Sequence, residues 1–172
     1  ENLLKKYGKG RERKTEVRLF EAIQAKHVAI ANTKVYLNRA DGFIGTGLKK
    51  DELAFECSDL DDIIVFTRRG LMKVVRVGEK VYIGKEIIHI AVFQKNDERT
   101  TYNMIYVDGG TGTSYAKRFN VTGITREKEY DLTRGNDKSK VHYFTANANG
   151  EAEVVSITLS PNCTARHKSL DF

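Results

Sequence analysis

The 172-residue sequence has no tryptophan, one proline, two methionines and two cysteines. Cys57 and Cys163 are too few for a disulfide framework or for a zinc site made of thiolates. No apolar run approaches the ~20 residues that a membrane-spanning helix needs, and the N-terminus lacks the apolar centre of a secretion signal. These absences exclude a membrane protein and predict a cytoplasmic location.

The composition is that of a folded domain. Hydrophobic residues make up 40% and charged residues 30%, which lies inside the globular range and far from the apolar depletion of disordered chains. This length predicts one domain with a real core and room for an appendage.

The positive charge is concentrated near the N-terminus. Residues 1–26 carry 8 basic and 4 acidic side chains, a balance of +4, while the remaining 21 basic and 19 acidic residues give only +2. An anionic partner therefore requires the charges of the body to be sorted onto one face. Residues 1–26 are predicted to be a basic tail or junction, with a solvated connector as the alternative.

The first residues also carry an apolar stripe. Residues 2–7 have the pattern of the last turns of a helix, with Gly8 where helices often stop, and a mixed strand or helix pattern follows. Because an apolar stripe needs something to cover it, we expect the chain to be a piece of a larger polypeptide.

From residue 27 onward the pattern is that of an all-β domain, with short β-type runs separated by Gly, Asn and Asp. Four segments share one pattern, in which an apolar run leads into a polar turn that ends in Gly. Each is predicted to be a β-hairpin. They are VYLNRADGFIGTGL, IIVFTRRGLMKVVRV, MIYVDGGTGTSYAKRFNV and VHYFTANANGEAEVVSITL, with the glycines Gly42, Gly70, Gly112 and Gly150. Further strands are expected around 81–83, 87–93 and 121–124.

The hairpin strands are apolar on both faces. After Gly70, Leu71 and Val75 point one way, whereas Met72 and Val74 point the other. Strands of this kind are covered on both sides, as in sheets that stack radially on one another. The sequence predicts a propeller-like arrangement of about three to four hairpin-containing blades, and it leaves open whether the ring closes.

No catalytic constellation is evident. The four histidines fall in different elements without a neighbouring ligand, and Asp59, Asp61 and Asp62 lack the Gly and distal Glu of a calcium loop. The segment DGGTGTSY matches neither the P-loop nor the dinucleotide fingerprint and is predicted to be a hairpin turn. We predict no catalytic residue, metal site or cofactor within the chain.

Basic residues recur at hairpin turns, on the strands that follow them and in the polar connections. A rim of Lys and Arg suits the DNA backbone, because phosphates are bound by charge without regard to base sequence. The alternative is that turns are polar anyway and that acidic neighbours cancel the field. The predicted DNA-binding residues are Arg39, Lys49, Lys50, Arg68, Arg69, Lys73, Arg76, Lys117, Arg118, Arg126, Lys128, Arg134, Lys138 and Lys140.

Several of these segments resemble a known family. KKYGKGRERKTEV resembles the junction at the end of the cleavage core of the A subunits of bacterial type II topoisomerases. VYLNRADGFIGTGL and IIVFTRRGLMKVVRV are similar to the blade motifs of their C-terminal domain. Together with KNDERTTYNMIYVDG, they place the sequence nearest to the topoisomerase IV members, with the gyrase members next.

The resemblance implies a β-pinwheel over residues 27–172, whose blades exchange strands and whose outer edge bends double-stranded DNA and presents it to the cleavage core. The partners that it implies are the remaining part of the A subunit together with the ATPase B subunit. It also implies a nucleoid-associated bacterial location, and ATP and Mg²⁺ as cofactors of the parent enzyme alone. None of the eight tyrosines is predicted to be the cleavage nucleophile, which belongs to a part of the enzyme outside this chain.

One departure from the family pattern bears on activity. No Gln-Arg-Arg-Gly-Gly box is present, and the connection after Leu48 reads KKDELAFECSDL. This difference favours decatenation or relaxation over the introduction of supercoils. A competing hypothesis from another class is a protein-interaction module of propeller type that does not bind DNA directly.

Overall fold

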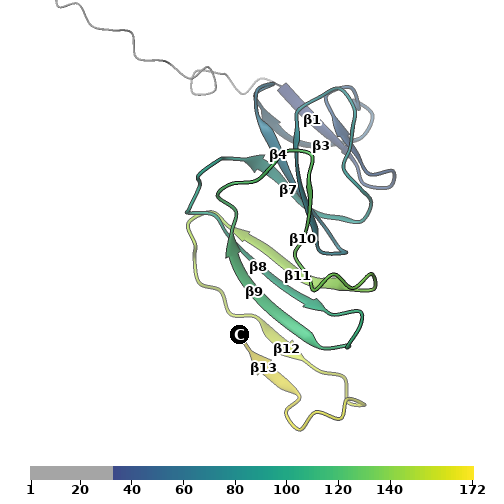
Figure 1. Cartoon of the computed structure of the whole chain (residues 1–172), viewed down its shortest axis with the longest axis vertical. Helices are drawn as coiled ribbons and strands as arrows, with labels where there is room; N and C mark the ends of the chain where they lie inside the picture. Colours follow the sequence, from purple (N-terminus) through teal and green to yellow (C-terminus); the bar gives the residue numbers. More distant parts are fainter. Residues whose placement is uncertain (1–32) are drawn as a thin grey trace, which may run out of the picture.

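The structure is a computed structural model that describes residues 33–172. The expected junction 1–26 and the first residues of the expected domain lie outside the described residues. The described part is all β, with thirteen strands in antiparallel sheets and no helix (Figure 1). No helix capable of crossing a bilayer is found among residues 33–172.

The strands form four sheets that follow one another in chain order along the long axis of the molecule (Figure 1). Sheet A has the order β3-β1-β2-β6, sheet B β10-β5-β4-β7, sheet C β11-β8-β9, and sheet D contains β12 and β13. The strands are β1 Thr33–Asn38, β2 Phe43–Gly45, β3 Glu52–Cys57, β4 Asp62–Thr67, β5 Leu71–Arg76, β6 Val81–Tyr82, β7 Ile87–Phe93, β8 Thr101–Val107, β9 Ser114–Asn120, β10 Glu129–Asp131, β11 Lys140–Asn147, β12 Ser156–Thr158 and β13 Ser169–Asp171. The sheets do not close into a ring within residues 33–172.

Sheets A, B and C repeat one plan. In each, a central strand pairs with the second strand of its hairpin on one side and with a later strand on the other. The hairpins at Gly42, Gly70 and Gly112 are confirmed, and these glycines have φ of 78°, 79° and 71°. A side chain in this left-handed region is strained, which is why the turns end in glycine.

Neighbouring sheets exchange strands. β6 follows the hairpin of sheet B but pairs with β2 of sheet A, and β10 follows the hairpin of sheet C but pairs with β5 of sheet B. The two exchanges are equivalent, because Ile83 N donates to Gly42 O and Leu132 N to Gly70 O, each over 2.9 Å. Each of these two hairpins is therefore locked by a segment from the next sheet.

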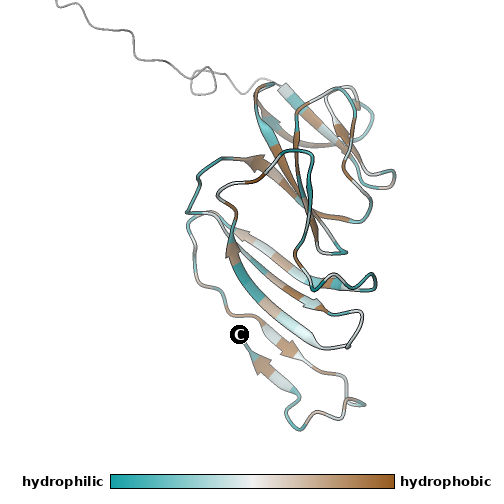
Figure 2. Ribbon diagram, in the orientation of Figure 1, coloured by the Kyte–Doolittle hydropathy of each residue, from teal (hydrophilic) through white to brown (hydrophobic). Residues whose placement is uncertain are grey.

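Sheet B is buried on both faces, as predicted from its two-sided apolar pattern. Val65 and Val75 pack with Val35 and Leu37 of sheet A, whereas Phe66 and Val74 join a second core that includes Tyr102 of sheet C. β4 has no exposed residue. Hydrophobic residues follow the strands, and the connections are mainly hydrophilic (Figure 2).

Several strand predictions were wrong or incomplete. The fourth hairpin does not form, because the whole of β11 pairs with β8 and β12 pairs with β13. Residues 121–124 are not a strand, although Val121 and Ile124 pack against the second core. The connection after Leu48 contains β3, and β10 was missed because three residues with two acidic side chains carry no apolar run.

Candidate nucleic-acid interface

Half of the predicted DNA-binding residues are held by contacts within the protein. Arg39 pairs with Glu52, Lys73 with Glu127 and Arg126 with Asp62, at nitrogen-oxygen distances of 3.0, 3.4 and 3.0 Å. Lys117 donates to the carbonyl of Leu132, Arg118 to that of Gly150, Arg134 to the hydroxyl of Tyr115, and Lys128 lies over the ring of Tyr130. These seven cations are at least partly neutralised or restrained.

The other seven have no ion pair or side-chain hydrogen bond within residues 33–172. They are Lys49, Lys50, Arg68, Arg69, Arg76, Lys138 and Lys140, all exposed. Lys49 and Lys50 lie between β2 and β3, and Arg76 ends β5, so these three are not grouped with the rest. The remaining four converge.

Arg68, Arg69, Lys138 and Lys140 line one shallow cavity of about 250 Å³, and we call these four residues the basic junction. Arg68 and Arg69 lie in the hairpin turn of sheet B, whereas Lys138 precedes and Lys140 begins β11 of sheet C. Glu86 and Asp137 line the same cavity, so its charge is 4 − 2, or +2. The structure thus gathers cations that are about 70 residues apart in the sequence.

The turn that carries the two arginines is fixed by the backbone on both sides. Arg68 N donates to Glu86 O over 2.8 Å, and Val141 N donates to Arg68 O over 2.7 Å. Glu86 has a φ of 58°, a left-handed conformation that non-glycine residues rarely adopt, and its carbonyl accepts the Arg68 bond there. The turn is therefore held between Glu86, the residue that precedes β7, and Val141 of β11.

The loop that carries Lys138 is held by the glycine-rich turn of sheet C. The buried carboxylate of Asp108 accepts from Asn136 Nδ2 over 2.7 Å and from the hydroxyl of Thr111 over 2.8 Å. The Asn136 bond, followed by those from Thr111, lowers the pKa of Asp108. Gly109 N donates to Ser139 Oγ over 3.1 Å.

Gly109 permits the close approach of the two loops. A Cβ at this position would lie 2.4 Å from the backbone carbon of Lys138. DGGTGTSY therefore is a hairpin turn, as predicted, and it also supports the part of the basic junction that β11 contributes.

The basic junction is better suited to binding the phosphate backbone of a nucleic acid than to catalysing a reaction. Four long cationic side chains project from two rigidly held segments, and exposed cations bind phosphate by charge and hydrogen bonding. Among residues 33–172, no group of three or more His, Cys, Asp or Glu side chains has the arrangement of a metal site.

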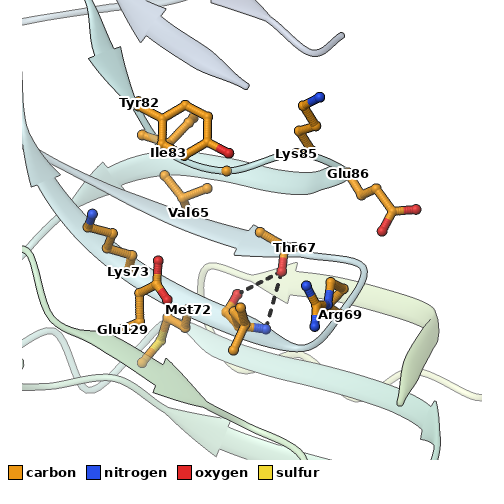
Figure 3. A pocket seen from close by; sticks show the side chains of 12 residues that line it. Val65, Thr67, Arg69, Met72, Lys73, Tyr82, Ile83, Lys85, Glu86 and Glu129 are labelled. Carbon is orange, nitrogen blue, oxygen red and sulfur yellow. Dashed lines mark hydrogen bonds between the residues drawn. The ribbon is translucent and has the colours of Figure 1, made fainter. Parts of the chain in front are cut away.

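Lys85 was not predicted and lies close to this interface. It lines a second cavity together with Arg69, on the segment between β6 and β7 (Figure 3). The sequence signal was weak, because Lys85 is followed by Glu86 and stands outside a hairpin turn. Only the exchange of β6 onto sheet A brings it near Arg69.

The fold and the basic junction define a class of protein: an all-β repeat domain whose sheets exchange strands and whose junction presents unpaired cations. Residues 34–172 match the family described as topoisomerase C-terminal domain, Bacteroidota, and the chain belongs to this family. The chain is also similar to the A subunit of DNA topoisomerase 4 from Borreliella burgdorferi, with 33% identity over 137 residues, which is 79% of the chain and 22% of that protein. The chain therefore spans about a fifth of this relative.

These comparisons confirm the predicted resemblance to the C-terminal domain of a bacterial type II topoisomerase A subunit of the topoisomerase IV kind. No solved structure matches the chain.

Proposed function

We propose that this domain binds double-stranded DNA without regard to base sequence, bends it, and presents it to the cleavage core of a type II topoisomerase. The observation that carries the proposal is the basic junction, where four cations from two sheets meet without a carboxylate ion pair within the described residues. The family membership supplies the topoisomerase context.

The energetics are adequate for bending. Bending a site of 20 to 30 base pairs costs on the order of 1 to 6 kcal/mol. Several charge-assisted phosphate contacts offset such a cost, and each contact releases counterions. The proposed arrangement is a β-pinwheel in which the junctions between blades face the duplex, with Lys49, Lys50 and Arg76 as outlying contacts. The seven restrained cations would contribute less.

The wider context is part of the same proposal. The partners are the remaining part of the A subunit together with the ATPase B subunit, and the parent enzyme uses ATP and Mg²⁺ at sites outside this chain. We place the assembly on the bacterial nucleoid. The missing Gln-Arg-Arg-Gly-Gly box supports decatenation or relaxation as its activity.

The test is a double charge reversal, Arg68→Glu with Arg69→Glu, measured by fluorescence anisotropy on a 30-base-pair duplex over a salt series. Each lost phosphate contact lowers the salt slope by about 0.9, so the slope should fall by roughly 2 and the affinity by at least about tenfold. Lys95→Glu with Arg166→Glu changes the net charge equally at exposed positions outside the junction, where neither side chain has an ion pair within residues 33–172, and is the matched control. Equal losses in both double variants would show that only net charge matters.

A second candidate function, a protein-interaction surface, is favoured by sheet D. Val154, Leu170 and Phe172 expose 77%, 41% and 59% of their surface. Exposed apolar groups of this size mark contact surfaces when they are contiguous. The double variant Leu170→Ser with Phe172→Ser would leave DNA affinity unchanged and abolish binding to the cleavage core if sheet D has this role.

A further inference from the structure

The largest hollow beside the basic junction is a cavity of about 460 Å³ between sheets A and B. This volume lies in the range of small-molecule sites. One wall is the segment Tyr82 to Glu86, and the opposite wall comes from β5, its turn and β10 (Figure 3). Val65 and Thr67 of β4 lie between the two walls (Figure 3).

The two ends of this cavity differ in chemistry. Tyr82, Ile83 and Met72 form an apolar and aromatic end with Val65 as its floor, whereas the charged side chains of Arg69, Lys85 and Glu86 lie toward the other end (Figure 3). Arg69 also belongs to the basic junction, so the charged end of the cavity is continuous with it. Neither Arg69 nor Lys85 has an ion pair within residues 33–172.

Tyr82 is an exposed aromatic ring that is nevertheless held in place. It keeps 54% of its surface accessible, while Phe43 packs against it edge-on at a centroid distance of 5.3 Å. The amino group of Lys80 lies 4.4 Å from the centroid of the Phe43 ring. A restrained, accessible ring is a stacking platform for a base.

The remaining polar groups suit a base rather than a second phosphate. The Thr67 hydroxyl is already engaged with Leu71, accepting from its N–H over 3.3 Å and lying 3.4 Å from its carbonyl oxygen. Glu129 lies near Lys73 at the aromatic end (Figure 3). A carboxylate accepts from the amino group of cytosine, adenine or guanine, which thymine lacks.

We propose that this cavity binds a single nucleotide outside a base stack, with its base on Tyr82 and its phosphate on Arg69, the cation that the cavity shares with the basic junction. The inference rests on the proposed function, because the phosphate end joins the basic junction. A kinked or strained duplex supplies such a nucleotide when one base leaves the stack, and a free nucleotide offers the same chemistry. Bases with an exocyclic amino group bind better than thymine.

The test compares the full 172-residue chain on a paired 30-base-pair duplex and on the same duplex with one unpaired cytosine. The unpaired cytosine should raise affinity about fivefold or more, in line with the effect of base stacking on an aromatic ring. Tyr82→Ala should remove this preference and leave binding to the paired duplex unchanged. Tyr82→Phe should keep it, and Phe172→Ala is the control for loss of an exposed aromatic ring elsewhere.

A second arm separates the two sources of the nucleotide. Cytidine monophosphate is titrated against the chain by calorimetry, with thymidine monophosphate as the comparison. Saturable binding that Tyr82→Ala abolishes, with no preference for the unpaired cytosine, assigns the cavity to free nucleotides. Equal affinity for both duplexes together with no binding of cytidine monophosphate overturns the proposal, and the proposed function stands if the paired duplex still binds. Loss of all DNA binding by the unaltered chain would instead overturn the proposed function.

Discussion

The guanidinium of Arg126 faces the buried carboxylate of Asp62, 64 positions earlier in the chain, with two nitrogen-oxygen distances of 3.0 Å. The Nη2–Oδ2 contact is a hydrogen bond, whereas the Nε–Oδ1 contact has the distance of an ion pair without hydrogen-bond geometry. Asp62 is the first residue of β4 and only 7% exposed. The pair ties the connection before β10 to the start of sheet B.

We therefore expect Arg126→Ala to act on stability and not on DNA affinity. Removing one partner of a buried ion pair costs about 3 to 5 kcal/mol, and the exposure of Arg126 should reduce this to about 1 to 3 kcal/mol. Urea denaturation measures the free energy of unfolding, with Lys49→Ala as the exposed control. A loss of DNA affinity as large as that of the Arg68 and Arg69 reversals would contradict the structural role.

Gly109→Ala should weaken DNA binding without altering any charge. The added Cβ would lie 2.4 Å from the backbone of Lys138, so the loop that carries this lysine must shift. We expect a several-fold lower affinity for the duplex and a smaller salt slope, by up to about 1. Gly123→Ala is the matched control, because nothing lies within 4 Å of a Cβ there. An unchanged salt slope in Gly109→Ala would show that the loop position does not matter.

The strand exchange can be tested by comparing alanine substitutions at two glycines. Gly42→Ala and Gly112→Ala introduce the same left-handed strain, since their φ angles are 78° and 71°. This strain costs about 1 kcal/mol. At Gly42 the Cβ would also lie 2.4 Å from Gly84 O, in the segment that exchanges onto sheet A, whereas at Gly112 it meets nothing within 4 Å.

Gly42→Ala should accordingly lose about 1 to 3 kcal/mol more than Gly112→Ala, as in other overpacked sites. Thermal and urea unfolding followed by circular dichroism give the two values. Equal losses would mean that the exchanged segment moves away without cost.

Acid should destabilise the domain through His89. Its Nε2 atom is buried without a hydrogen-bond partner, among the rings of Phe66, Tyr102 and Phe144. Burial lowers the pKa of His89 below its ordinary value of 6.5, and it raises the pKa of Tyr102 to about 12, so this tyrosine stays neutral. Asp97 lines the same small cavity as His89.

The sign follows from proton binding. The unfolded chain takes up a proton near pH 6.5 and the folded chain only at lower pH, so stability is full above pH 6.5 and falls as the pH drops below it. The slope is at most about 1.4 kcal/mol per pH unit for one proton. His89→Leu should reduce this loss of stability in urea titrations between pH 7 and 5. His142→Leu, a substitution at an exposed position, should not reduce it. A decline of the same steepness in His89→Leu would assign it to other groups.

Much of the fold followed from local patterns. Short apolar runs around polar turns that end in glycine identified the hairpins at Gly42, Gly70 and Gly112, and the two-sided apolar pattern of β5 predicted the burial of sheet B. The fourth hairpin failed because its first strand, β11, is the outer strand of sheet C. A turn at Gly150 is present, with a φ of 66°, but no local signal states which edge a strand will join.

The sequence predicted the kind of site, a surface of basic residues, but not which residues form it. Fourteen cations fitted the pattern equally well, and the structure left seven without a side-chain partner and brought four of them together. Arg134 shows the difficulty, because this residue of the connection before β11 has its partner, Tyr115, 19 positions away on β9. Lys85 is the opposite case, a cation that the sequence did not single out, because it lies near Arg69 only as a result of strand exchange.

The sequence by itself determined an all-β domain, its turns, its doubly covered strands and its family, because these depend on residue type and on spacing over a few positions. Only the tertiary structure decided which sheet β6 and β10 complete and which cations remain available to a phosphate. The physical reason is that hydrogen bonds between strands and ion pairs such as Arg126 with Asp62 are formed by atoms that are distant in the chain, and the free energy that selects them belongs to the packed sheets.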